Sequence, residues 1–109
     1  MLTECKKALR ITADAYDGEL CALMDAAVRD LGIAGVIIPG TVSFSMTQSG
    51  ITDGSTLTDP LVMRAVFTYV RMHFGSPADY DRLAASYDLQ RRQLANATGY
   101  TNFGKAAET

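Results

Sequence analysis

The sequence contains little of what metal sites and disulfide frameworks are built from. Its 109 residues include two cysteines, one histidine and no tryptophan. Cys5 and Cys21 form no CxxC pair, so neither a zinc site nor a disulfide scaffold is predicted. Both thiols are expected to be free and packed in the interior of a protein made in a reducing cytoplasm.

Long apolar runs and an excess of basic charge are also missing. No stretch approaches the ~18 apolar residues that a membrane span requires. Lys6, Lys7 and Arg10 interrupt the segment where a secretory signal would be apolar. The formal net charge is −2, whereas a dedicated nucleic-acid-binding domain is usually basic. No membrane partner is expected, and a nucleic-acid binder is disfavoured.

Patterns typical of enzymes are absent as well. The glycines follow neither the GxGxxG nor the GxxxxGK[ST] pattern, so no phosphate-binding loop is predicted. His73 stands late in an apolar helical stretch without a second histidine, which favours a structural role. Residues 53–59 lack the alternating oxygen ligands and closing glutamate of a calcium loop. We therefore expect no catalytic residue, no cofactor and no metal, and we do not expect an enzyme.

What the sequence does contain is the pattern of one small, mainly α-helical domain. Hydrophobic residues make up 48% of the chain, which allows one modest core at this length. We expect a bundle of about four helices, with a short β-hairpin or an extended loop between the second and the third. The predicted domain covers residues 1–99, and residues 100–109 form a C-terminal tail.

Four segments repeat apolar residues at the three- and four-residue spacing of a helix. Gly32 is expected to end the second of them. Asp59 and Pro60 are expected to cap and begin the third, because proline gives up no hydrogen bond at the first helical position. Ser76 and Pro77 repeat this arrangement before the fourth. The four predicted helices span residues 4–10, 14 or 17 to 31, 60–74 and 77–97.

The last two predicted helices differ in their apolar faces. The third is apolar over a broad face, which indicates burial on more than one side. The fourth has a narrow apolar stripe that fits one partner helix. We expect these two helices to build most of the core and part of the contact between subunits. The stripe consists of Tyr80, Leu83, Tyr87 and Leu94.

The middle of the chain, residues 33–58, is rich in glycine, serine and threonine. Val42, Phe44 and Met46 alternate with serines, which is the period of a half-buried strand. Residues 36–38 are either a second short strand or an apolar plug. Because a lone hairpin is marginal in water, this segment is expected to lean on the helices or on another copy of the protein.

Side chains of the fourth helix and of the tail are candidates for contacts with partners. Arg91 and Arg92 follow Asp88 at three and four positions, which fits an ion-paired surface, and arginine is also favoured at interfaces. Aromatic residues in a polar tail often anchor on a partner. The expected interface residues are Tyr80, Tyr87, Arg91, Arg92, Leu94, Tyr100 and Phe103.

Over nearly its full length the chain resembles the small head–tail connector proteins of long-tailed bacteriophages, also labelled DNA-packaging proteins. The resemblance is carried by residues 59–75, DPLVMRAVFTYVRMHFG, and by residues 79–102, DYDRLAASYDLQRRQLANATGYTN. The second segment contains the pairs Tyr87-Asp88 and Gln93-Leu94. These motifs are structural and bring no catalytic residue with them, and residues 33–58 do not align.

The resemblance implies a helical subunit of the virion, assembled in the cytoplasm of the bacterial host. Such subunits form a ring, typically dodecameric, beneath the portal protein. The ring extends the DNA channel and receives a tail-side head-completion or stopper protein. Double-stranded DNA is expected to pass without specific binding, because a lumen that neutralised many phosphates would grip it.

Two further expectations concern the parts of the chain outside the helices. The tail after Gly99 is expected to order on the portal. The middle segment is expected to face the channel or the tail-side partner. Its candidate residues are Phe44, Met46, Gln48 and Asp53.

The alternative function is a small helical DNA-binding or regulatory module. The third and fourth helices, joined at residues 75–77, superficially resemble a helix-turn-helix. The would-be recognition helix, however, begins with Asp79 and Asp81, which phosphates would repel.

Overall fold

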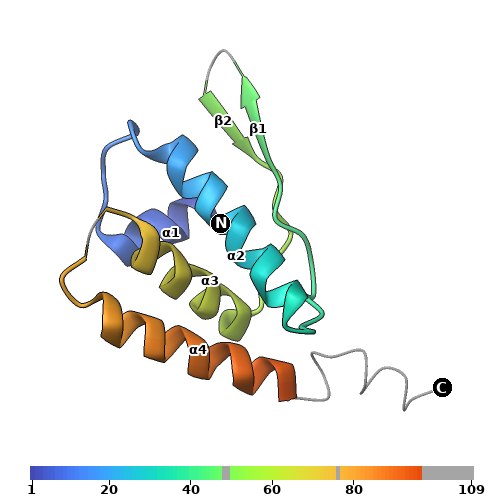
Figure 1. Cartoon of the computed structure of the whole chain (residues 1–109). Helices are drawn as coiled ribbons and strands as arrows, with labels where there is room; N and C mark the ends of the chain where they lie inside the picture. The colour runs from blue at the N-terminus through green and yellow to red at the C-terminus, as the bar shows by residue number, and fades with distance from the viewer. Residues whose placement is uncertain (48–49, 76, 97–109) are drawn as a thin grey trace.

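A computed structural model gives the arrangement of residues 1–47, 50–75 and 77–96. Four helices make up the body, and two strands form an antiparallel hairpin between the second and third of them (Figure 1). The predicted mainly α-helical fold, including the hairpin between these helices, is confirmed. The elements are α1 (Leu2–Leu9), α2 (Asp17–Ile33), β1 (Phe44–Thr47), β2 (Gly50–Asp53), α3 (Pro60–His73) and α4 (Tyr80–Asn96).

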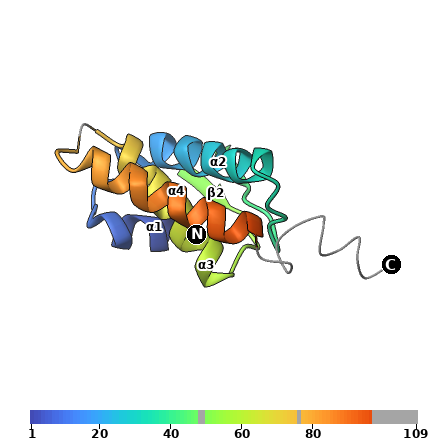
Figure 2. The ribbon, with the colours of Figure 1, turned by 60° about the horizontal axis from the view of Figure 1, so that its bottom comes forward.

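Helix α3 is the centre of the body. It packs against α1, α2 and α4, which lie around it (Figures 1 and 2). Val62, Ala65, Val66 and Val70 are completely buried, which accounts for the breadth of its apolar face. The prediction that this helix is covered on more than one side is confirmed.

Helix α2 contributes more to the core than the sequence indicated. It supplies as many buried side chains as α3 and more than α4. Leu20, Met24, Ala27 and Leu31 are completely buried. The expectation that the third and fourth helices build most of the core is therefore wrong, because α4 buries only one narrow stripe while α2 faces α3 along its length.

The end of α2 corrects the prediction for Gly32. The helix continues through Gly32 to Ile33. Gly35 then adopts a φ of 95°, and the N–H of Val36 donates to the carbonyl of Leu31 at 3.0 Å. This closing bond requires a left-handed residue, which glycine provides at little cost. The second of the two glycines, rather than the first, ends the helix.

The hairpin pairs β1 with β2, with Phe44 opposite Asp53 and Met46 opposite Ile51. The alternating stretch predicted around Phe44 does form a strand, but its partner follows it in the chain. Residues 36–38 are the apolar plug, since Val36 is buried and Ile38 packs against the core.

The two capping predictions had different outcomes. Asp59 caps α3 as expected, because its Oδ1 accepts from the N–H groups of Leu61 and Val62 at 3.0 and 3.2 Å. Helix α4 begins at Tyr80 rather than at Pro77, and the carbonyl of Asp79 accepts its first helical hydrogen bond. The predicted cap Ser76 lies outside the described residues. Helix α1 spans residues 2–9 instead of 4–10.

Gly32 and Gly35 should respond in opposite ways to the same substitution. Gly32→Ala is expected to raise the free energy of unfolding by about 0.5–1 kcal/mol, because alanine favours the helix and a Cβ there meets no atom. Gly35→Ala is expected to lower it by about 1–2 kcal/mol, because a positive φ is costly for a residue with a Cβ. Urea unfolding followed by circular dichroism measures both. A stabilising Gly35→Ala would contradict the helix end assigned here.

Candidate functional site

The hairpin projects from the helical body (Figure 1), and Phe44 and Ile51 of its strands pack against the core. Met46 is 78% exposed and Phe44 is half-buried. Between the hairpin and α2 lies a shallow hollow, lined by Val42, Phe44 and Met46 on one side and by Ala22 on the other. Within the part of the chain that the structure describes, the apolar face of the strands is therefore only partly covered.

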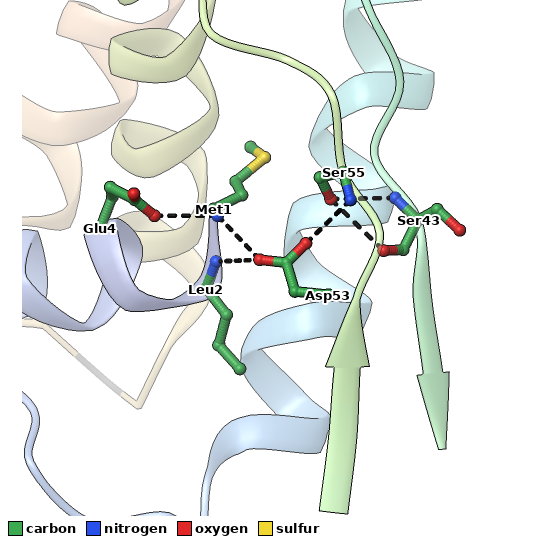
Figure 3. Close-up of polar contacts among 6 residues, drawn as sticks. All are labelled: Met1, Leu2, Glu4, Ser43, Asp53 and Ser55. Atoms are coloured by element: carbon green, nitrogen blue, oxygen red, sulfur yellow. Dashed lines mark hydrogen bonds and ion pairs between the residues drawn. The ribbon is translucent and has the colours of Figure 1, made fainter. Parts of the chain in front are cut away.

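Asp53, at the end of β2, joins the hairpin to the start of α1 (Figure 3). Its carboxylate accepts from the amine of Met1 at 2.7 Å, from the N–H of Leu2 at 2.9 Å and from the N–H of Ser55 at 3.0 Å. The Met1 amine also forms an ion pair with Glu4 at 2.8 Å. One carboxylate thus joins the end of β2 to the start of α1, two segments that are about fifty positions apart in the chain.

The serines and threonines beyond the strands continue the pairing of the two hairpin arms (Figure 3). The N–H of Ser43 donates to the hydroxyl of Ser55 at 3.0 Å, and the N–H of Thr41 donates to the hydroxyl of Thr56 at 2.8 Å. Gly40 allows the arms to approach closely, because a Cβ there would lie 2.9 Å from the Cα of Leu57. The composition of the middle segment is explained by this side-chain ladder at the base of the hairpin.

The contacts of Asp53 shift the pKa values of its carboxyl and of the Met1 amine in opposite directions. Burial disfavours the charged form of Asp53, but the hydrogen bonds from Met1, Leu2 and Ser55 outweigh it and hold the pKa of the carboxyl well below its usual range. Burial likewise lowers the pKa of the Met1 amine, but Asp53 and Glu4 outweigh this effect, so the pKa is raised overall. Both groups stay ionised across the neutral range, so the ion pair between the Met1 amine and the Asp53 carboxylate is retained there.

Two of the expected interface residues lie in the core instead. Tyr87 and Leu94 are each 5% exposed. The hydroxyl of Tyr87 donates to the carboxylate of Asp30 on α2, and its ring lies 5.3 Å from that of Tyr69. Burial, followed by the bond to Asp30, raises the pKa of Tyr87. These two side chains hold α4 to the body and are not part of a free surface.

The remaining face of α4 is exposed and ion-paired. Arg91 reaches Asp88 at 3.2 Å and Asp30 at 3.5 Å, and Arg92 reaches Asp88 at 3.0 Å. The predicted ion-paired face is confirmed, and Asp30 is an addition that the sequence did not indicate. Leu89 is exposed on the same helix.

Tyr80 lies at the start of α4 next to His73. The two rings are 6.2 Å apart, and the His73 ring also lies 4.4 Å from that of Tyr69. This stack places His73 among aromatic rings at the junction of α3 and α4. The other candidate residues, Gln48, Tyr100 and Phe103, lie outside the described residues.

Both cysteines belong to the hydrophobic core. Cys5 and Cys21 are free and buried, as predicted. Burial raises the pKa of each thiol to about 11. Within residues 1–47, 50–75 and 77–96, no group of three or more His, Cys, Asp or Glu side chains is placed to hold a metal ion. No helix in these ranges is long and apolar enough to span a membrane.

Sequence reasoning missed the roles of Asp30 and Asp53. Asp30 sits between the buried positions Ala27 and Leu31, and a polar residue at the edge of an apolar stripe is a detectable signal. Asp53 was a candidate for the channel or tail-side surface, but the sequence did not indicate its partners Met1 and Leu2, which are about fifty positions away. Only the folded arrangement brings them together.

Comparison with known proteins gives the family of the chain. A family model described as "Phage connector protein" matches residues 1–101, which include all the helices and both strands. No curated protein and no solved structure matches. The resemblance inferred from the sequence is confirmed at the level of the family.

Replacing Asp53 with asparagine should loosen the hairpin. At pH 7, Asp53→Asn is expected to lower the free energy of unfolding by about 1–3 kcal/mol, because charge-assisted bonds to the amine and to two N–H groups are weakened. The folded-state pKa of Asp53 is depressed. Its contribution is therefore present above the unfolded pKa of about 3.9 and is lost as the pH falls below that value.

The stability difference between wild type and Asp53→Asn should accordingly shrink in urea titrations at pH 3 and below. The control is Asp25→Asn, which removes an exposed pair with Arg29 and should cost less than about 0.5 kcal/mol. If the two substitutions lowered the free energy of unfolding equally at pH 7, the Asp53 carboxylate would not hold the hairpin to α1 as described.

Removing the hydroxyl of Tyr87 tests whether this residue belongs to the core. Tyr87→Phe is expected to lower the free energy of unfolding by about 1–2 kcal/mol, because the half-buried carboxylate of Asp30 loses a donor. Tyr80→Phe serves as the control, since Tyr80 is exposed, and it should leave stability within about 0.5 kcal/mol. Chemical unfolding of the two variants gives the comparison. If Tyr87→Phe unfolds like wild type, the bond contributes nothing to the fold.

Proposed function

The chain belongs to the phage connector family, and from this premise we propose that its copies form a ring beneath the portal of a long-tailed bacteriophage. The connector role makes the protein a structural component of the virion at the head–tail junction. In our proposal the ring is a dodecamer that extends the DNA channel, binds the portal on one side and receives the tail-side head-completion or stopper protein on the other. Assembly takes place in the cytoplasm of the bacterial host.

The observation that carries the proposal is the anchored hairpin. A two-stranded ribbon is marginal by itself, yet this one is clamped at its base by Asp53 and by the serine and threonine ladder. Its outer part carries the exposed Met46, which lines the shallow hollow between the hairpin and α2. A rigid arm with an uncovered apolar side suits a contact with another subunit or protein.

The charge of the middle segment supports a position near the channel or the tail side. Residues 41–58 contain no lysine and no arginine. A segment without cations releases few counterions from DNA and does not grip its phosphates. We propose that Phe44, Met46 and Gln48 face the channel or the tail-side partner, while Asp53 holds the arm in place.

The outer face of α4 and the tail are proposed as the portal-side surface. Tyr80 and Arg92 are exposed on this face, and Arg91 is half-buried. Tyr100 and Phe103 follow in the tail. Tyr87 and Leu94 support this surface from beneath. The alternative of a DNA-binding module gains no support, because Asp79 and Asp81 stand at the start of α4 and Arg82 is paired with Asp79.

Purified protein should assemble into closed rings as its concentration rises, or when the portal protein of the same phage is added. Sedimentation velocity with and without the portal measures the assembly, and negative-stain micrographs show whether the particles are rings with a central opening. A chain that stays monomeric at every concentration and also ignores the portal would contradict the proposal.

A further inference from the structure

An open groove runs along α3 between α1 and α4. Its volume is 690 Å³, which lies within the range of ligand-binding clefts. Met63 and Phe67 of α3, both half-buried, and Leu83 of α4 line it. Pro60 borders the groove near the start of α3, and Arg71 borders it near the end. An apolar groove of this size suits an occupant with large apolar side chains.

Gln90 of α4 gives a second, independent observation on the same groove. It lines the groove, and its side-chain oxygen is buried without a hydrogen bond from the described residues. Its amide nitrogen makes only a long bond, 3.4 Å, to the hydroxyl of Ser86. A buried acceptor without a donor costs about 1–3 kcal/mol, and the last torsion of a glutamine turns easily. An occupant that brings backbone N–H groups into the groove would supply the donor.

The end of α4 lies towards one end of this groove. The ring of Tyr80 lies 6.2 Å from that of His73, and the ring of Tyr87 lies 5.3 Å from that of Tyr69. Because the later residue of α4 contacts the earlier residue of α3, the two helices run antiparallel, as Figure 1 shows. The last residue of α4, Asn96, therefore lies towards the start of α3, and the chain continues from there.

The segment that follows α4 has the composition of such an occupant. Residues 97–109, ATGYTNFGKAAET, lie outside the described residues. Residues 97–104 carry no charged side chain and include Tyr100 and Phe103. Their burial removes two aromatic side chains from water without desolvating an ionised side chain. Gly99 precedes the first aromatic residue, and a glycine permits the sharp turn that brings the chain back along α4.

We infer that residues 100–103 occupy the groove of their own subunit before assembly. Gln90 lies about 9 Å before Asn96 along the helix. At about 3.3 Å per residue, four extended residues span about 13 Å and seven span about 23 Å. Tyr100 therefore reaches back to Gln90, and Phe103 reaches further along the groove. A connection this short gives an effective concentration in the millimolar range, which favours the chain's own groove over that of a second copy.

The inference concerns the free subunit and does not depend on the ring. The aromatic side chains of the segment cover Met63 and Phe67, which the described residues leave half-exposed. One consequence does rest on the proposed function: the proposed portal contact of Tyr100 and Phe103 requires these side chains to leave the groove.

A disulfide trap in the full-length chain tests the contact. One cysteine replaces Asn102 in the proposed segment, and the other replaces Ser86, which lines the groove. In the matched control the second cysteine replaces Ala85, the neighbouring residue of α4, which is exposed and does not line the groove. The native thiols of Cys5 and Cys21 interfere little, because burial raises the pKa of each to about 11.

The Asn102→Cys/Ser86→Cys variant is expected to form its intramolecular disulfide roughly tenfold faster than Asn102→Cys/Ala85→Cys, because docking raises the effective concentration only at the groove. Non-reducing electrophoresis of samples taken from a glutathione buffer at low protein concentration gives both rates. Thermal unfolding under reducing conditions verifies that each variant is folded.

Two further substitutions test the aromatic anchors. In the Ser86→Cys background, Tyr100→Ala together with Phe103→Ala is expected to lower the rate to that of the control, because the apolar contacts with the groove are removed. Thr101→Ala lies between the anchors and should leave the rate unchanged.

The outcomes separate this inference from the proposed function. Equal rates for the Ser86→Cys and Ala85→Cys variants would overturn it, and so would a rate that is unaffected by loss of the two aromatic side chains. Disulfide-linked dimers in place of the intramolecular product would also overturn it, because the groove would then receive the segment of a second copy. A protein that forms the intramolecular disulfide as expected but never assembles, with or without the portal, would contradict the proposed ring and support the groove contact.

Discussion

The enclosure of α3 by α1, α2 and α4 is the constraint on which the rest of the structure depends. Its core positions are mostly valines, which are stiff and only moderate helix formers. The helix therefore owes its stability to packing, at roughly 1.5–3 kcal/mol for each fully buried valine, and to the Asp59 cap. Because α3 uses so much of its circumference for the core, α2 and α4 need only one buried face each. Their outer faces remain available for other contacts.

The hairpin cannot depend on packing in the same way, since its strands bury little of their own surface. Its direction is fixed by polar bonds at the base, where the Asp53 carboxylate meets the start of α1. The arm and α1 are therefore positioned together, and a movement of one strains the other. A surface that is ordered before association loses less conformational entropy on binding. A fixed arm is thus better suited to an assembly than a loop of the same composition.

The parts of this structure that local rules govern could be predicted from the sequence, and the parts that depend on distant partners could not. Asp59 and Pro60 mark a helix start through bonds to their immediate neighbours, so the prediction held. Gly32 and Gly35 can each end a helix. Which of them ends α2 depends on the burial of Val36 in the core. Tyr87 lies on the predicted stripe of α4, yet its burial depends on Asp30 of another helix. The position of a residue on the apolar stripe of a predicted helix therefore does not show whether it contacts the core or another subunit.

The distribution of charge separates folding from assembly. On α4, Arg91 and Arg92 are neutralised by acids of the same chain, whereas Arg64 and Glu19 have no such partner among the described residues. Local pairs stabilise the monomer only slightly, so the outward charges add little to the fold and are free to direct association. Some apolar side chains, such as Ile33 and Leu89, are also exposed. In the ring proposed above every subunit would be held on two sides, so contacts that are weak singly would become strong together.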